Sequence, residues 1–293
     1  MSKLKAIWQL MRLEHGVMIA LAILVGAVIA QKTFPAVDKF ILTFFTALFL
    51  EASTFALNDY YDLQIDRANK RMDRPLVRGD LAPKTAVYLF LVLFPLGILC
   101  SYFVNLTCFF IALITALFAI VYDAVLKKIK LLGNFFIAYV MAIPFVFGGA
   151  AVVSGNAFSL NVNPAIVIIA LIAFLAGAGR EIMKDVQDFE GDKEKGVRSF
   201  PRYIGIRASN SIAAVFYLFA IALSFVPFSL PSYNQYYQNI YYLGVVVVCD
   251  TMLLSTSLQL IIKRKVNMRY HRKFSLIALF IGLLAFLVGA FTG

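Results

Sequence analysis

The sequence predicts an all-α, polytopic membrane protein with nine transmembrane helices. Of its 293 residues, 61% are hydrophobic and only 15% are charged, and the mean hydropathy is +0.84. A soluble domain is usually about half apolar and a quarter charged, so this composition excludes an ordinary soluble protein. Long apolar runs and an alternating distribution of basic residues support the same fold class.

The apolar runs give the number of spans. A helix needs about 20 mostly apolar residues to cross the hydrocarbon core of a bilayer. Taken in order, the runs that meet this requirement are residues 16–31, 39–60, 82–103, 106–125, 132–153, 164–184, 207–229, 238–262 and 273–291. Nine helices place the two ends of the chain on opposite sides of the membrane.

Basic residues test this count independently. Lys and Arg are concentrated at the amino end and in the second, fourth, sixth and eighth connections, and the other face has only Lys32 and Lys39. One helix more or fewer would destroy this alternation. The positive-inside rule therefore predicts a multi-pass cell-membrane protein with its amino end in the cytoplasm and its carboxyl end outside. Basic loops also explain the net charge of +11 without a nucleic-acid partner.

Two acidic clusters with the spacing D-x-x-D-x-x-x-D end the second and the sixth span. Their members are Asn58, Asp59, Asp62 and Asp66 in the first cluster, and Asp185, Asp188 and Asp192 in the second. On a helix, the three carboxylates of each cluster would form one stripe, at positions i, i+3 and i+7. Both clusters are expected on the cytoplasmic face of the membrane.

The clusters predict a divalent metal. Two carboxylates about 5 Å apart repel by roughly 3 kcal/mol at an effective dielectric constant near 20, so a membrane-flanked cluster requires a compensating cation. Oxygen ligands without His or Cys favour Mg²⁺, which commonly leaves coordination positions for substrate phosphates. The alternative is a solvated helix end, where the repulsion is below about 1 kcal/mol. The repetition of the pattern favours the metal.

Basic residues beside the clusters are candidates for binding phosphate oxygens, and they also act as topology signals. They are Arg67, Arg71, Arg74, Lys127, Lys184 and Arg198. Tyr122 ends the fourth span, about one and a half helical turns before Lys127. It is either an interfacial anchor or an active-site hydroxyl.

Three segments resemble motifs of the UbiA family of intramembrane prenyltransferases. They are NDYYDLQIDR with RPLVRG (58–67 and 74–79), YDAVLKKIKLLGN (122–134) and REIMKDVQDFEGDKEKGVRSFP (180–201). The resemblance implies a single domain over residues 1–293, in which the helices surround a central cavity under a cytoplasmic cap. It also implies two Mg²⁺ ions that connect the clusters to a prenyl diphosphate.

The resemblance assigns a role to each matching residue. The expected metal ligands are Asn58, Asp59, Asp62, Asp66, Asp185, Asp188 and Asp192. The expected substrate-binding residues are Asn58, Arg67, Arg71, Lys127, Lys184 and Arg198. The expected catalytic residues are Asp62, Asp66, Asp188, Asp192 and Tyr122, with Asp66 or Asp192 as candidate base for the acceptor.

The implied reaction is transfer of a prenyl group, expected to be geranylgeranyl, from its diphosphate to a lipophilic acceptor in the membrane. The segment that begins REIMKDVQDFEGD, from Arg180, is most similar to archaeal members that alkylate geranylgeranylglyceryl phosphate in ether-lipid synthesis, and an aromatic quinone precursor is the alternative acceptor. An ion-coupled secondary transporter is less favoured, because its carboxylates are expected near the membrane midplane. No obligate protein partner is expected.

Two further carboxyl groups, Glu51 and Asp250, lie inside spans, where an ionisable group is a functional candidate by default. Each can equally be a structural group bonded within the bundle. His15 and His271 lie near membrane boundaries and are expected to be interfacial residues.

Overall fold

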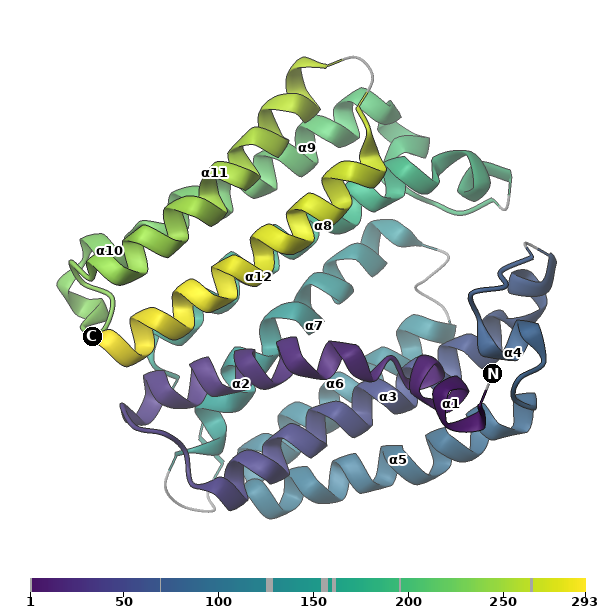
Figure 1. Ribbon diagram of the computed structural model, residues 1–293, viewed down its shortest axis with the longest axis horizontal. Coiled ribbons are helices and arrows are strands. Elements are labelled where there is room, and N and C mark those ends of the chain that lie inside the picture. Colours follow the sequence, from purple (N-terminus) through teal and green to yellow (C-terminus); the bar gives the residue numbers. More distant parts are fainter. Residues whose placement is uncertain are drawn as a thin grey trace.

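The computed structural model describes residues 2–68, 70–124, 129–153, 158–159, 162–194, 196–263 and 266–293. Every regular element within these residues is a helix, and nine of those helices are long and apolar enough to cross a membrane. The long helices run side by side, and the two chain ends lie at opposite ends of the assembly (Figure 1). The predicted all-α fold with nine spans is confirmed.

The helices follow the predicted order. The long ones are α2 (Gly16–Gln31), α3 (Val37–Ala68), α5 (Pro83–Val104), α6 (Leu106–Ala124), α7 (Lys130–Ala151), α8 (Pro164–Glu194), α9 (Phe200–Ser224), α11 (Ile240–Ile262) and α12 (Met268–Thr292). The short elements are α1 (Lys3–Met11), η1 (Leu13–His15), α4 (Pro75–Arg78), α10 (Val226–Ser229) and η3 (Pro231–Tyr233).

The helices α3 and α8 continue well past the predicted ends of their spans, at residues 60 and 184. The prediction followed hydrophobicity, which ends where the acidic clusters begin. The backbone remains helical there because Gln, Glu, Lys and Arg, which accompany the aspartates, are good helix formers. Both acidic clusters therefore lie on helical surfaces, and their stripes are real.

The seventh predicted span, residues 207–229, is divided between α9 and α10. Pro227 lacks a backbone N–H and lies in the first turn of α10, where that donor is not needed, and the regular helix is interrupted just before it. At the other end of α9, Gly205 has φ +80° and ψ 164°, which separates the first turn from the rest of the helix. The regular part of α9 thus begins close to the predicted start.

The arrangement places α7 and α2 between two groups of helices (Figure 1): α3, α5 and α6 on one side, and α8, α9, α11 and α12 on the other. The backbones of α2 and α7 approach closely at two glycines. A Cβ on Gly26 would overlap the carbonyl of Phe145, and a Cβ on Gly148 would overlap the carbonyl of Ile23. Small residues that let helix backbones approach are typical of packing in membranes.

The amino-terminal helix α1, which packs against the end of α3 and against α4, was not predicted. Buried Leu10 of α1 belongs to the same apolar cluster as Leu63 of α3 and Leu76 of α4. Ser2 caps the helix by accepting a hydrogen bond from the Lys5 amide at 3.4 Å. This packing places Arg12, the residue that follows α1, beside the first acidic cluster.

Candidate functional site

The first acidic cluster lies at the carboxyl end of α3, and its first carboxylate accepts hydrogen bonds from two arginines. Asp59 is 3% exposed, and its Oδ1 accepts hydrogen bonds from Nη2 of Arg12 at 3.1 Å and from Nη1 of Arg74 at 2.9 Å. The Nε of Arg74 also lies 3.7 Å from Asp66. Asp59 therefore fixes α1 and the segment before α4 to α3.

Asn58 and Asp62 lie one helical turn apart and interact directly. With the Asn58 amide oriented to suit its neighbours, its nitrogen donates to Oδ2 of Asp62 at 3.0 Å and to Oδ1 of Asp123 at 3.2 Å. Asp123 lies near the end of α6 and is 5% exposed. Burial raises the pKa of Asp66 above its ordinary value; Arg74 opposes this and Asp62 adds to it. The cluster thus concentrates negative charge in a partly desolvated place.

The second acidic cluster lies on α8 and is supported by α7. Asp185 is 1% exposed, accepts a hydrogen bond from Nδ2 of Asn134 at 2.8 Å and lies 3.5 Å from Nζ of Lys130. The same Lys130 donates to Oδ2 of Asp192 at 2.6 Å. Asp188, between them in the stripe, is half-buried. As in the first cluster, the first carboxylate is buried and held by donors from neighbouring segments.

Arg71, in the connection after α3, connects the two clusters electrostatically. It donates to Asp73 from Nε at 2.9 Å and from Nη2 at 2.7 Å. This bidentate hydrogen bond raises the pKa of Arg71, and the charges of Asp66 and Asp188 add to the effect. The same bond lowers the pKa of Asp73 to about 2. Arg71 is therefore a fixed positive charge that interacts with carboxylates of both α3 and α8.

Tyr122, on α6, lies near both clusters. Its ring stacks on that of Phe136 of α7 with 5.2 Å between the centroids. Its hydroxyl is within electrostatic range of Asp62 on α3 and Asp185 on α8. This position favours the active-site interpretation of Tyr122 over the interfacial one.

The other expected phosphate ligands have different surroundings. Nζ of Lys184 lies 3.0 Å from Oε2 of Glu181, which is on the same helix, so its side chain is directed at another carboxylate. Arg67 and Arg198 are exposed. Lys127 lies outside the described residues. The structure therefore brings Arg71 and Arg74 to the clusters more directly than the remaining candidates.

Four residues of the site were not singled out from the sequence: Arg12, Asp123, Lys130 and Asn134. Lys130 and Asn134 lie within the segment that resembles the second family motif, and Asp123 follows Tyr122 directly. Their positions next to recognised motif residues could have identified these three as site candidates. Arg12 offered none, because only the fold of α1 brings it to Asp59.

The ionisable residues inside the spans have partners within the bundle. Oε1 of Glu51 lies 3.4 Å from Nδ1 of His15, and Asp250 accepts a hydrogen bond from Oγ of Ser224 at 2.7 Å. His271, expected at an interface, is only 2% exposed. These contacts supply each group with a structural role.

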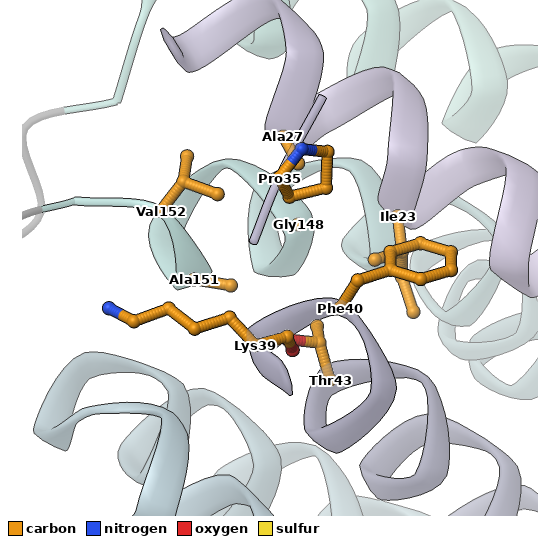
Figure 2. Close-up of a pocket in the computed structure, with 9 residues that line it drawn as sticks. All are labelled: Ile23, Ala27, Pro35, Lys39, Phe40, Thr43, Gly148, Ala151 and Val152. Carbon is orange, nitrogen blue, oxygen red and sulfur yellow. The ribbon is translucent and has the colours of Figure 1, made fainter. Parts of the chain in front are cut away.

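A small apolar pocket between α2, α3 and α7 is separate from the acidic clusters (Figure 2). It is too narrow to hold a water molecule and is lined by residues that include Pro35, Lys39 and Val152. These residues lie at the start of α3 and just after α7, whereas the clusters lie at the opposite end of α3 and near the start of α7. The pocket takes no part in the candidate site.

The donor set fits Mg²⁺. Asn58, Asp62, Asp66 and Asp188 offer only oxygen atoms to a metal, and hard cations prefer oxygen ligands. Within the described part of the chain, no three Asp, Glu, His or Cys side chains are close enough together to enclose an ion. Mg²⁺ usually binds through one or two carboxylates and completes its shell with waters and substrate phosphates, which suits such an open arrangement.

Comparison with known proteins agrees with this geometry. Residues 19–279 match the UbiA prenyltransferase family. A digeranylgeranylglyceryl phosphate synthase from Archaeoglobus fulgidus is 40% identical over 290 residues, which cover 98% of this chain and 96% of the relative. A solved structure of a digeranylgeranylglyceryl phosphate synthase is 34% identical, has a TM-score of 0.79 and covers 99% of both chains.

A more distant likeness concerns the fold alone. A UbiA homologue from Archaeoglobus fulgidus, solved with bound GPP and Mg²⁺, is 17% identical to this chain. Its TM-score is 0.58, and the match covers 97% of this chain and all of the homologue. Because the family model matches most of the length of this chain, the chain belongs to the UbiA prenyltransferase family.

Proposed function

We propose that the protein transfers a geranylgeranyl group from its diphosphate to a hydroxyl of geranylgeranylglyceryl phosphate, in a Mg²⁺-dependent step of ether-lipid synthesis. The observation that carries the proposal is the pair of acidic clusters on α3 and α8. In each cluster a half-buried aspartate follows a buried aspartate that accepts hydrogen bonds from neighbouring segments. The acceptor comes from the similarity to digeranylgeranylglyceryl phosphate synthases, one of them 40% identical over nearly its whole length.

The metal ligands we propose are Asn58 and Asp62 on α3 and Asp188 on α8, with Asp66 and Asp192 in support. Two ions are expected. When bound, Mg²⁺ would neutralise the diphosphate and stabilise it as a leaving group.

Asp59 and Asp185 were expected among the metal ligands, but anchoring roles suit them better. Arg12 and Arg74 contact Asp59, and Lys130 and Asn134 contact Asp185. Both arginines bind Oδ1 of Asp59, and its Oδ2 is buried without a hydrogen-bond partner, whereas Lys130 and Asn134 occupy both oxygens of Asp185. Burial and compensated charge therefore make these two carboxylates less accessible to a metal than half-buried Asp62 and Asp188.

The reaction requires correctly positioned substrates, positive charge around the leaving diphosphate and a site that excludes water. Arg71, Arg74 and Lys130 would contact phosphate oxygens as the carbon–oxygen bond to the diphosphate breaks. The aromatic face of Tyr122 would stabilise the allylic cation that remains. The acceptor hydroxyl then forms the new carbon–oxygen bond, and a carboxylate, Asp66 or Asp192, takes its proton. Exclusion of water protects the cation from hydrolysis.

The topology proposed for this enzyme follows the basic residues. The amino end and the acidic clusters would face the cytoplasm and the carboxyl end would lie outside. The whole chain, residues 1–293, would act as one domain that takes both substrates from the membrane, through a central cavity under a cytoplasmic cap.

The test is an alkylation assay with purified protein, Mg²⁺ and labelled geranylgeranyl diphosphate. Geranylgeranylglyceryl phosphate and an aromatic quinone precursor are offered separately, and the first is expected to be alkylated. Alkylation of the aromatic compound alone would establish the alternative acceptor class. Uptake of a solute into sealed vesicles without diphosphate release would instead support a transporter.

Two substitutions test the site. Asp62→Ala and Asp188→Ala should each abolish turnover while the thermal unfolding temperature stays near that of the wild type. Near-normal activity in either variant contradicts the two-cluster site.

A further inference from the structure

A second group of charged residues lies next to the acidic stripe of α8, and the proposed reaction has not used it. Arg180 and Lys184 of α8 both contact Glu181, from Nη1 to Oε1 at 3.1 Å and from Nζ to Oε2 at 3.0 Å. Arg272 of α12 donates to Oε1 of Gln187 of α8 at 3.0 Å and lies within electrostatic range of Glu181. Two cations thus contact Glu181, and a third lies near it.

The group has unused capacity for an anion. Glu181 is 5% exposed and balances one of the three positive charges. The Nε atoms of Arg180 and Arg272 are both buried, and neither has a hydrogen-bond partner. Burying an unpaired donor on a charged group is costly, so two such donors in one group indicate a ligand that accepts from them.

Helix geometry places the group where a substrate can reach it. Successive residues of an α-helix turn by about 100°, so Lys184 and Asp188 share a face of α8, and Arg180 and Gln187 lie beside that face. Asp185 contacts α7 through Asn134, and Gln187 contacts α12 through Arg272. Lys184, half-buried, therefore lies on the part of α8 between those two neighbours. This is the side on which Asp188 is proposed to bind metal.

The depth of the group is also informative. Glu181 precedes Asp188 by about two helical turns, or roughly 10 Å along the axis, toward the apolar half of α8. An anion bound by Arg180 and Arg272 would thus lie on the membrane side of the diphosphate. A glycerol phosphate has only three carbons, so its reacting hydroxyl stays within a few ångströms of its phosphate. Bound there, the acceptor would present this hydroxyl toward the acidic clusters.

We propose that Arg180, Lys184 and Arg272 bind the phosphate group of the acceptor. The inference rests on the proposed function and changes the role of Lys184 from a ligand of the donor diphosphate to a ligand of the acceptor. It also explains how the enzyme binds two phosphorylated lipids at different places in one membrane site. The donor has its diphosphate at the metal-binding clusters, and the acceptor has its monophosphate at a site of arginine and lysine.

The test compares Arg272→Gln with the wild type. Loss of a charge-assisted hydrogen bond to phosphate is expected to raise KM for geranylgeranylglyceryl phosphate roughly tenfold to a hundredfold. KM for geranylgeranyl diphosphate should stay unchanged. The preference for the phosphorylated acceptor over unphosphorylated geranylgeranylglycerol should fall by the same factor. Arg272→Lys should recover part of it.

Lys273→Gln is the matched control. Lys273 is the exposed neighbour of Arg272 on α12, and its loss changes the net charge equally. It should leave both KM values near those of the wild type. An unchanged acceptor KM in Arg272→Gln, or an equal rise in both KM values, overturns the proposal.

Two further measurements distinguish the acceptor from a lipid headgroup as the bound phosphate, and failure of this proposal from failure of the proposed reaction. Acceptor binding, followed by thermal stabilisation without donor and with chelator, should persist in the wild type and be lost in Arg272→Gln. If that variant instead loses only a stabilisation by vesicles of anionic phospholipid, the group binds a lipid headgroup and the proposal fails. If wild-type protein binds the acceptor without alkylating it, the proposed reaction fails and the binding site stands.

Discussion

Asp59 provides the sharpest test of the proposed division between anchoring and metal-binding aspartates. Its side chain is 2% exposed and lies within hydrogen-bond distance of two guanidinium groups, at 3.1 Å and 2.9 Å. Unit charges about 4 Å apart attract by about 4 kcal/mol at an effective dielectric constant of 20, before desolvation is subtracted. Removing one partner of a buried pair costs about 3–5 kcal/mol, because the remaining charge is left uncompensated. We expect Asp59→Asn to destabilise the protein by this amount.

The assay measures thermal unfolding and, separately, the Mg²⁺ concentration that gives half-maximal activity. Asp59→Asn should lower the unfolding temperature and leave the Mg²⁺ requirement of the surviving folded enzyme unchanged. The exposed pair of Arg71 with Asp73 supplies a control, since Asp73→Asn should cost less than about 1 kcal/mol. If Asp59→Asn leaves the unfolding temperature unchanged and raises the Mg²⁺ requirement, Asp59 is a metal ligand and the reasoning is refuted.

Three further outcomes follow from the contacts. Gly148→Ala should cost about 1–3 kcal/mol of stability because its Cβ overlaps the carbonyl of Ile23, whereas Gly244→Ala, with open space around it, should be near neutral in the same unfolding assay. Lys130→Gln should lower kcat at least about tenfold, since two carboxylates lose their cation, while Lys193→Gln, on the exposed end of α8, should not.

For Asp73, the pKa falls from its ordinary value of 3.8 to about 2 on folding, so its ion pair stabilises the protein above pH 4 and loses this effect as the pH falls toward 2. The difference in unfolding temperature between the wild type and Asp73→Asn should therefore be nearly constant above pH 4, shrink as the pH falls through 2 and disappear below it.

The fold was predictable because its dominant signal is local. A bilayer demands runs of apolar residues of fixed length, and the positive-inside rule checks their number. The prediction of helix ends was wrong at segments that lie outside the apolar runs. The carboxyl ends of α3 and α8 leave the apolar region and continue as helices, and α1 becomes ordered only by packing Leu10 against Leu63 and Leu76. Tertiary contacts decide such segments, and hydrophobicity does not report them.

The positions of the candidate-site aspartates at the ends of two helices were predictable from the sequence, and their hydrogen-bond partners were not. Arg12 contacts a residue 47 positions away, and Lys130 contacts one 62 positions away. Pairs at that separation depend on which helices become neighbours. The position of Lys130 near the start of α7, one turn before Asn134, brings both donors to Asp185. Without the packing of α7 on α8, Lys130 is one basic residue among several in its connection.

The packing also explains why identical spacing produces unequal aspartates. Residues i and i+3 of a helix lie on the same face but point about 60° apart, so Asp59 and Asp62 meet different surroundings, and so do Asp185 and Asp188. In each cluster the first residue turns toward donors from adjacent segments and is buried, and the middle one remains half-buried. The donors differ: arginines after α1 and before α4 hold Asp59, and a lysine and an asparagine of α7 hold Asp185. The repeated motif therefore specifies where carboxylates lie on a helix, while the neighbouring helices decide which of them stay open to a metal.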